Sequence, residues 1–252
     1  MKLIAILRIK DEILYIERCL SRLTSLVDEI IILDNGSTDG TLDVYPKFSK
    51  IVKVLQTEGF DEGRDKIMLL DAAKKRNPDW ILWIDGDEEM EESLDRSVLD
   101  SYMNSKYNKV SFRMCNFWLS EKLYRIDGKY FGYTLHPQRS MWRNIETAYF
   151  RDRLIHNGDI FGIDKPFFVS PYRIKHYGYA NAEKMRKKYE LYKAVDKSSS
   201  RDYEHLNPDV STIRIPYISF KNKIANKIFI GFYKVVISLV QLVYRIFCKI
   251  AK

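Results

Sequence analysis

Two aspartates separated by one glycine, Asp85 and Asp87, directly follow the apolar run at residues 80–84. Carboxylates at this spacing in a tight turn can direct their oxygens towards one point. Hard divalent cations prefer oxygen ligands and are often shared with substrate phosphates, so the turn predicts a metal site that offsets charge on a leaving diphosphate. A solvated acidic turn before a helix is the alternative, since the glutamates within 88–92 suit a helix N-terminus.

The segments around these aspartates alternate between strand and helix patterns through the first 85 residues. Apolar runs predict strands at 3–8, 28–33, 51–56 and 80–84, and helical spacing predicts helices at 11–23, 38–45 and 61–76. This alternation predicts an α/β fold with a mostly parallel sheet flanked by helices. Ligands of such sheets bind beyond the carboxyl ends of the strands, where Asp34 and Asp85 both fall.

The second half of the chain is richer in aromatic and β-branched residues. Its patterns predict strands at 110–119, 130–142 and 167–176 and a charged helix at 180–195. Because no linker separates this half from the first, we expect one continuous α/β body.

Composition excludes several classes of protein. The 252 residues are 46% hydrophobic and 30% charged, which is typical of a globular chain and not of a disordered or fibrous one. The three cysteines, at 19, 115 and 248, are scattered, so we expect no disulfide framework or structural zinc and a reducing, cytoplasmic compartment. The apolar run at 3–7 ends at Arg8 and is too short for a signal peptide.

The positive charge of the chain is concentrated at its C-terminus. Residues 221–252 hold seven of the 42 lysines and arginines and none of the 34 acidic residues, so the preceding residues carry 35 cations against 34 acids. A nucleic-acid-binding protein normally carries its basic patch on the folded body, so we expect no nucleic-acid partner. A basic and apolar tail is better matched to an anionic membrane surface.

The polar residues of this tail predict an amphipathic helix lying in the membrane interface. They recur every three or four residues and therefore form one stripe on an otherwise apolar helix. A spanning helix over 228–247 is one alternative, but it would place Lys234 inside the bilayer. A helix packed in a core or a dimer is the other. The stripe consists of Lys223, Lys227, Gly231, Lys234, Ser238, Gln241, Arg245, Lys249 and Lys252.

Four segments in the first 90 residues resemble, in order and spacing, the family 2 nucleotide-sugar glycosyltransferases of the GT-A fold, which is Rossmann-like. They are IAILRIKDEILYIERCL (4–20), VDEIIILDNGSTDGT (27–41), FDEGRDK (60–66) and DWILWIDGDEEM (79–90). Later segments resemble the acceptor-side elements of bacterial enzymes that glycosylate lipopolysaccharide core or other cell-surface glycans. These are LHPQRSMWR (135–143), LIHNG (154–158) and IKHYGY (174–179).

The resemblance implies a role for four residues in binding the nucleotide. Leu7 and Glu12, around the end of the first strand, would line the nucleotide pocket. Asp34 would accept a hydrogen bond from the base, and Arg64 would approach the base or a phosphate.

The resemblance also implies a metal site at the DXD motif. Asp85 would contact the ribose or the metal, and Asp87 would bind Mg²⁺ or Mn²⁺ on the diphosphate. His176 stands where many GT-A enzymes place a late metal ligand or a phosphate contact. A structural histidine in a strand is the alternative for this residue.

Two departures from the family pattern bear on catalysis. Asp11 stands where relatives usually have asparagine, and His156 is followed by Asn157 where relatives often have glutamate. The second change removes a carboxylate that could have been the base that an inverting transfer needs. Asp152, His156 and Asp159 remain as candidates for this base, and a surface loop role is the alternative for each.

We therefore expect a metal-dependent, inverting glycosyltransferase that moves a sugar from a nucleotide-sugar to a hydroxyl of a lipid-linked or cell-surface glycan. The expected donor is a UDP-sugar. Residues 1–200 would form the GT-A domain, with a nucleotide-binding half at 1–90 and an acceptor half at 91–200. Residues 201–220 would connect it to the tail at 221–252, which would hold the enzyme at the cytoplasmic face of the membrane. A nucleotidyltransferase and a non-catalytic membrane-bound scaffold are the alternatives. The first normally has a glycine-rich phosphate loop, which LRIKDE lacks.

Overall fold

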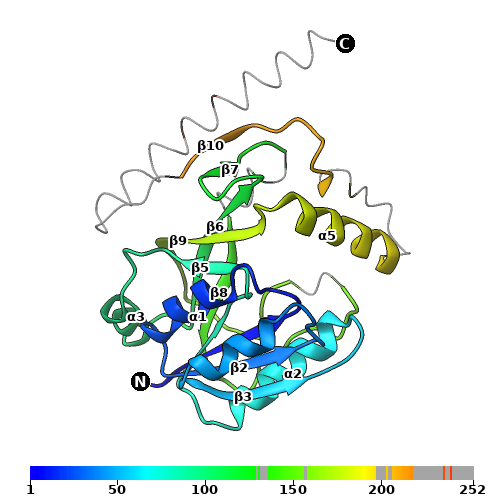
Figure 1. Ribbon diagram of the computed structural model, residues 1–252. Coiled ribbons are helices and arrows are strands. Elements are labelled where there is room, and N and C mark those ends of the chain that lie inside the picture. Colours follow the sequence, from blue (N-terminus) through cyan, green and yellow to red (C-terminus); the bar gives the residue numbers. More distant parts are fainter. Residues whose placement is uncertain are drawn as a thin grey trace.

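The computed structural model of the chain is a central sheet with helices on its faces (Figure 1). It describes residues 1–128, 130, 136–155, 158–196, 203, 206–217, 235 and 239. The predicted connecting loop at 201–220 is therefore described only in part. Of the predicted tail helix, the structure describes only Val235 and Leu239, so that prediction lies almost entirely outside the described residues. Within the described part of the chain, every helix is too short or too polar to cross a bilayer.

The first half of the chain forms a block of four parallel strands in the order β3-β2-β1-β4. Its elements are β1 (Leu3–Ile9), α1 (Ile16–Thr24), β2 (Glu29–Asp34), the 3₁₀ helix η1 (Thr41–Lys47), β3 (Ile51–Gln56), α2 (Glu62–Lys74) and β4 (Trp80–Trp83). β1 lies in the middle, paired with both β2 and β4. The carboxyl ends of these strands therefore share one edge of the sheet.

The second half adds strands of mixed direction to β4. Its elements are β5 (Glu88–Met90), α3 (Arg96–Met103), β6 (Lys109–Trp118), β7 (Leu123–Arg125), β8 (Pro137–Arg143), β9 (Phe167–Tyr179), α5 (Ala182–Val195) and β10 (Arg214–Pro216). β8 pairs antiparallel with both β4 and β6, while β9 runs parallel to β6 and antiparallel to β5. The predicted parallel arrangement thus holds for the first four strands, and the whole sheet is mixed.

Two core layers, one on each face of the sheet, explain why its strands are apolar throughout. Alternate residues of β1 point to opposite faces. Leu3 and Ala5 pack in the layer that α1 and α3 cover, and Ile4 and Ile6 pack in the layer that α2 covers. Every residue of β1 except Arg8 is buried, so the strand shows a continuous apolar run and no alternation.

Three predicted elements differ from the observed ones. The helix predicted from residue 11 begins at Ile16, because Asp11 takes a left-handed conformation with φ 51° and Leu14 is 60% exposed. The short helix expected to stop before Pro46 is a 3₁₀ helix that runs through it to Lys47. The strand expected from residue 130 is observed only from Pro137, with 131–135 outside the described residues.

Candidate active site

The Asp85-Gly86-Asp87 turn lies between β4 and β5, at the carboxyl edge of the parallel strands. A side chain at position 86 would press on the end of β1, because a Cβ there would lie 2.5 Å from Ile9 Cδ1 and 3.2 Å from Glu12 Cγ, so Ile9 would have to shift. Glycine therefore lets the turn pack against the end of β1. The glutamates after the turn form β5 and not a helix, and Glu88 is buried. The alternative of a solvated acidic turn before a helix is wrong.

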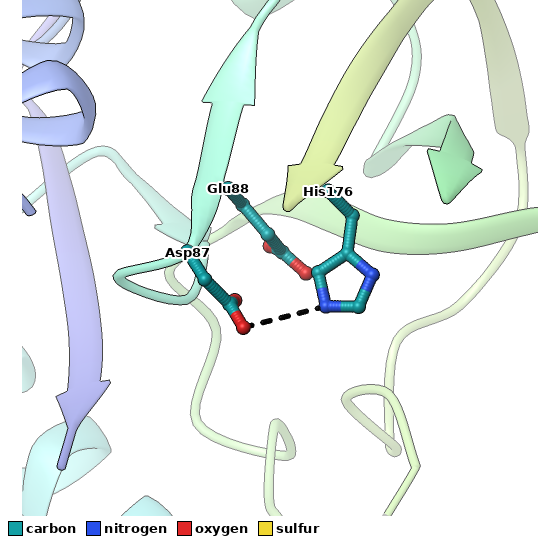
Figure 2. A group of neighbouring side chains, drawn as sticks. All are labelled: Asp87, Glu88 and His176. Atoms are coloured by element: carbon teal, nitrogen blue, oxygen red, sulfur yellow. Dashed lines mark ion pairs between the residues drawn. The ribbon is translucent and has the colours of Figure 1, made fainter. Parts of the chain in front are cut away.

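Asp87 and His176 form a buried pair on neighbouring elements (Figure 2). His176 Nε2 lies 3.5 Å from Asp87 Oδ2, and its other ring nitrogen, Nδ1, lies 2.7 Å from Asn116 Oδ1 on β6. The backbone fixes the same approach, because Tyr177 N donates to the Asp87 carbonyl at 2.8 Å. Asn116 therefore orients the imidazole of His176, and the backbone hydrogen bond between Tyr177 and Asp87 holds the ring beside the Asp87 carboxylate.

Asp87, Glu88 and His176 can bring one ligand atom each within 4.8 Å of one another, and all three are buried. Two carboxylate oxygens and one imidazole nitrogen are donors that suit Mn²⁺ or Mg²⁺. Asp85 is not part of this group, and its carboxylate pairs with Arg139. The same arginine holds Glu88, with Nε 2.9 Å from Oε2. The donor set thus fits a divalent ion and includes Glu88, which was not predicted. The predicted contact of Asp85 with the ribose or the metal stays a prediction.

The turn after β2, at residues 35–41, positions Glu12 through hydrogen bonds to the backbone. Side-chain oxygens of Ser37, Thr41 and Asp39 accept hydrogen bonds from the N–H groups of residues 11, 12 and 13 at 2.8–3.0 Å. These bonds give acceptors to three backbone N–H groups between β1 and α1, which belong to no helix or strand. The second motif of the sequence therefore holds the first motif in place and sets the position of Glu12.

Lysines from α5 lie beside the acids of the turn. The Nζ atoms of Lys184 and Lys188 lie 3.8 and 3.7 Å from Asp87 Oδ2, and Lys184 also forms an ion pair with Glu12. Burial alone would raise the pKa of Asp87, but His176, Lys188 and Lys184 outweigh burial and hold that pKa well below its usual range. Burial, and then the charge of Asp87, raise the pKa of Glu12 to about 8.

Two adjoining cavities, of about 280 and 300 Å³, open above the turn. The His176 cavity is lined also by Met114, Asn116, Gln138, Arg139 and Glu62, and the Asp87 cavity by Lys10, Asp11, Glu12, Lys184 and Lys187. Both cavities share Arg8, Phe60, Asp85, Lys188 and Tyr192. Together they form one cleft with acids on its floor and cations around it.

The residues predicted to bind the nucleotide are not all in this cleft. Glu12 lines it, whereas Leu7 packs in the core and lines neither cavity. Asp34 is fully buried, and its two oxygens accept hydrogen bonds from Ser37 N at 2.7 Å and Tyr45 Oη at 2.6 Å. In this conformation Asp34 holds the turn after β2, and its contact with a base stays a prediction.

Arg64 lines neither cavity, whereas Arg8 lines both. The Arg64 guanidinium binds Asp65 and the carbonyls of residues 58 and 59. Arg8 lies 4.7 Å from the centre of the Phe60 ring and donates from Nε to Asp65 Oδ2 at 2.8 Å. Arg8 thus has a fixed place in both cavities, although the sequence did not single it out.

None of the described base candidates lines the cleft. Asp152 is exposed. Asp159 accepts from Ser140 Oγ at 2.7 Å and pairs with Lys109 at 3.3 Å. His156 lies outside the described residues. The catalytic roles of these three residues stay predictions.

The family model for glycosyl transferase family 2 matches residues 5–161, which is more than half of the chain. The chain belongs to glycosyl transferase family 2. This confirms the predicted family and, with the observed sheet and helices, the predicted GT-A fold class. The matched region holds β1 to β8 and the whole Asp85–Asp87 turn, while His176 and α5 lie beyond it.

Individual relatives are more distant. The chain is similar to residues 1–349 of S. aureus TarS in complex with UDP, at 18% identity over 82% of this chain and 68% of that one, with a TM-score of 0.45. It is also similar to the complex of the same protein with UDP-GlcNAc, at 17% identity over 82% of this chain and 69% of that one, with a TM-score of 0.44. A TPR repeat-containing protein of Synechococcus elongatus is 32% identical over 83 residues, which are 32% of this chain and 19% of that protein. The chain thus matches about a fifth of that relative's length.

The segments that resemble the family contain only some of the residues that complete the cleft. Lys184 and Lys188 were detectable in principle, since they stand four residues apart on a helix that the sequence predicted directly after KHYGY. Arg139 stands inside LHPQRSMWR, but neither Arg139 nor Asn116 was singled out. Their roles arise from the pairing of β8 and β9 with β6, which brings residues far apart in the chain together.

Proposed function

We propose that the protein is a metal-dependent, inverting glycosyltransferase that uses a nucleotide-sugar, specifically a UDP-sugar, as donor. The observation that supports this most is the buried Asp87–His176 pair on the floor of a cleft lined by cations, in a chain of glycosyl transferase family 2. Such a cleft has the charge to bind a diphosphate and the donor atoms to bind a divalent ion.

The donor would occupy the Asp87 cavity, and its sugar would face the His176 cavity. Asp87, Glu88 and His176 would hold the divalent ion, which supplies positive charge opposite the leaving diphosphate. Arg8, stacked on Phe60 at the junction of the cavities, would orient the donor. Asn116 would keep the imidazole of His176 turned towards Asp87.

Inverting transfer needs a base to take the proton of the acceptor hydroxyl. Asp152 and His156 remain proposed bases, because the neighbouring carbonyls of residues 153 and 154 bind the N-terminus of α2 beside the cleft. Glu62, at that N-terminus, pairs with Lys66 at 2.7 Å but lines the His176 cavity itself, and it joins them as a candidate. Asp159 is the weaker candidate because its carboxylate is already bound to Ser140 and Lys109.

Hydrolysis of nucleotide-sugars in the presence of Mn²⁺ tests this function without knowledge of the acceptor. Purified full-length protein is incubated with a panel of donors, with Asp87→Asn as the test variant and Asp71→Asn, an exposed residue of α2, as its matched control. We expect hydrolysis of one donor class, lost in Asp87→Asn and in excess chelator but kept in Asp71→Asn. Hydrolysis that persists in Asp87→Asn contradicts the metal role, and no hydrolysis of any donor favours the scaffold alternative.

The base is tested with single variants once a donor and an acceptor are known. Removing the true base is expected to lower turnover by about 10²-fold or more while donor affinity is kept. The variants are Asp152→Asn, His156→Gln, Asp159→Asn and Glu62→Gln. Normal turnover in all four would place the base elsewhere or contradict inversion.

We further propose that the acceptor is a lipid-linked or cell-surface glycan and that the tail at 221–252 binds the anionic cytoplasmic face of the membrane. The seven cations of the tail and its single polar stripe support this. Truncation after Phe220 is expected to keep donor hydrolysis and to abolish pelleting with anionic liposomes. Equal pelleting of the truncated and full-length proteins contradicts the role of the tail.

A further inference from the structure

Two lysines one turn apart on α5 reach into the Asp87 cavity from the helix. The side chains of Lys184 and Lys188 are 17% and 24% exposed, and both lie within 3.8 Å of Asp87 Oδ2. The lysine between them differs: Lys187 is 77% exposed and pairs along the helix with Glu183. One face of α5 therefore directs its cations at the floor of the cleft.

The acids and cations on this floor lie against one another in the absence of a ligand. Glu12 and Asp87 supply two acidic side chains, and Lys184 and Lys188 supply two ammonium groups beside them. A diphosphate alone would draw the lysines from the acids, and a divalent ion alone would meet the lysines at Asp87. When the two arrive together, the ion can take the place that the lysines leave.

Lysine chemistry fits such an exchange of partners. The lysine ammonium is a compact charge on a flexible stem, so it can move from a carboxylate to a phosphate oxygen in the same cavity. A charge-assisted hydrogen bond to phosphate replaces the one to the acid. As the lysines leave, Asp87 loses the cations that oppose a divalent ion.

Resting on the proposed function, we propose that Lys184 and Lys188 bind the diphosphate of the donor and compete with the divalent ion for Asp87. The diphosphate draws the lysines away from the acids, and the ion takes their place. Each ligand therefore increases the affinity for the other, and this coupling is reciprocal. The lysines are positioning residues that make binding of the ion depend on the donor.

Binding measurements on the full chain test this with inorganic pyrophosphate and Mn²⁺ as separate probes. The variants are Lys184→Gln and Lys188→Gln, with Lys193→Gln as control, because Lys193 lies on the same helix, is exposed and lines neither cavity. Pyrophosphate affinity is measured in chelator by calorimetry, and Mn²⁺ affinity without pyrophosphate by electron paramagnetic resonance.

The two affinities are expected to change in opposite directions. Each glutamine variant should bind pyrophosphate roughly tenfold to 100-fold more weakly, as for loss of one charged hydrogen bond. Each should bind Mn²⁺ severalfold more tightly, since one competing cation is gone. The Lys→Arg variants should recover pyrophosphate binding, and Lys193→Gln should change neither affinity.

Damage to the fold would weaken both probes together, and that result overturns the proposal. Unchanged pyrophosphate binding in both glutamine variants, or no pyrophosphate binding by the unaltered protein, also overturns it. Donor hydrolysis by the unaltered protein is measured in parallel. Hydrolysis without dependence of pyrophosphate binding on the lysines rejects this inference alone, whereas lysine-dependent binding without hydrolysis rejects the proposed activity alone.

Discussion

Replacing Gly178 by alanine tests whether the Asp87–His176 pair depends on the close approach of β9 to the turn. A Cβ at this position would lie 2.7 Å from His176 Nε2 and closer still to Asp87 Oδ2. The backbone of Gly178 lies outside the left-handed region, so alanine brings no strain of its own there. The whole effect of the substitution must come from the new methyl group pressing on the two side chains.

The size of the effect follows from how little these side chains can move. Both are buried, and the backbone of Asp87 is held by the hydrogen bond from Tyr177 N. An extra methyl group in a well-packed site costs about 1–3 kcal/mol. For a chain of this length that corresponds to a fall in melting temperature of about 2–10 °C. The carboxylate and imidazole should separate, and Mn²⁺ binding should weaken by about tenfold or more.

Thermal unfolding and Mn²⁺ titration measure the two consequences separately. Gly128→Ala is the matched control, because its Cβ would meet nothing within 4 Å although φ is 54°. That variant should lose about 1 kcal/mol of stability to backbone strain and keep its Mn²⁺ affinity. If Gly178→Ala is within 0.5 kcal/mol of the unaltered protein, a change of ordinary surface size, the close approach described for β9 is refuted. If it is destabilised but binds Mn²⁺ normally, the pair does not hold the ion.

Two further predictions concern residues outside the metal group. Asp34→Ala should lower the free energy of unfolding by about 2–4 kcal/mol, because it leaves Tyr45 Oη and a backbone N–H without their buried acceptor; unchanged stability in urea unfolding would contradict this structural role. Arg76, with Lys2, lowers the pKa of Glu29 to about 2, so the ionised carboxylate stabilises the fold above about pH 4.5 and this contribution is lost as the pH falls towards 2. Glu29→Gln should therefore cost about 1 kcal/mol at pH 7, allowing for solvent screening, and much less at pH 2, and a cost that does not change with pH would refute the ion pair.

Strands β1 and β2 could be predicted because their residues are buried on both faces of the sheet, and a continuous apolar run is visible without knowledge of the neighbours. The limits predicted for β3, Ile51–Gln56, are those observed, although most of its residues are exposed. The start of α1 was missed for a related reason. Ile13 fits the helical spacing, but its N–H bonds to Asp39, and this long-range bond keeps the segment out of the helix. The spacing of residues 11–23 gives no information about Asp39, the distant partner of this hydrogen bond.

A site residue was predictable where its own motif indicates its role, and not where its role depends on contact with a distant segment. Asp87 and His176 were identified from their motifs, and the structure brings them together. Asp34 was identified too, but burial by Tyr45 gives it a structural role that the sequence did not indicate. Glu88 looked like part of an acidic helix start, because its partner Arg139 is 51 residues away.

The acids and cations of the cleft also explain why the second half of the chain must pack where it does. Asp87 is buried and Glu12 is half-buried beside it, where the charge of Asp87 raises the pKa of Glu12. The Asp87 carboxylate without cations would be strongly unfavourable, because an unpaired buried charge costs several kcal/mol. Lys184 and Lys188 supply that compensation from a helix almost a hundred residues further on. α5 therefore lowers the cost of placing these acids together, and the same helix brings cations to the site that we propose for the diphosphate.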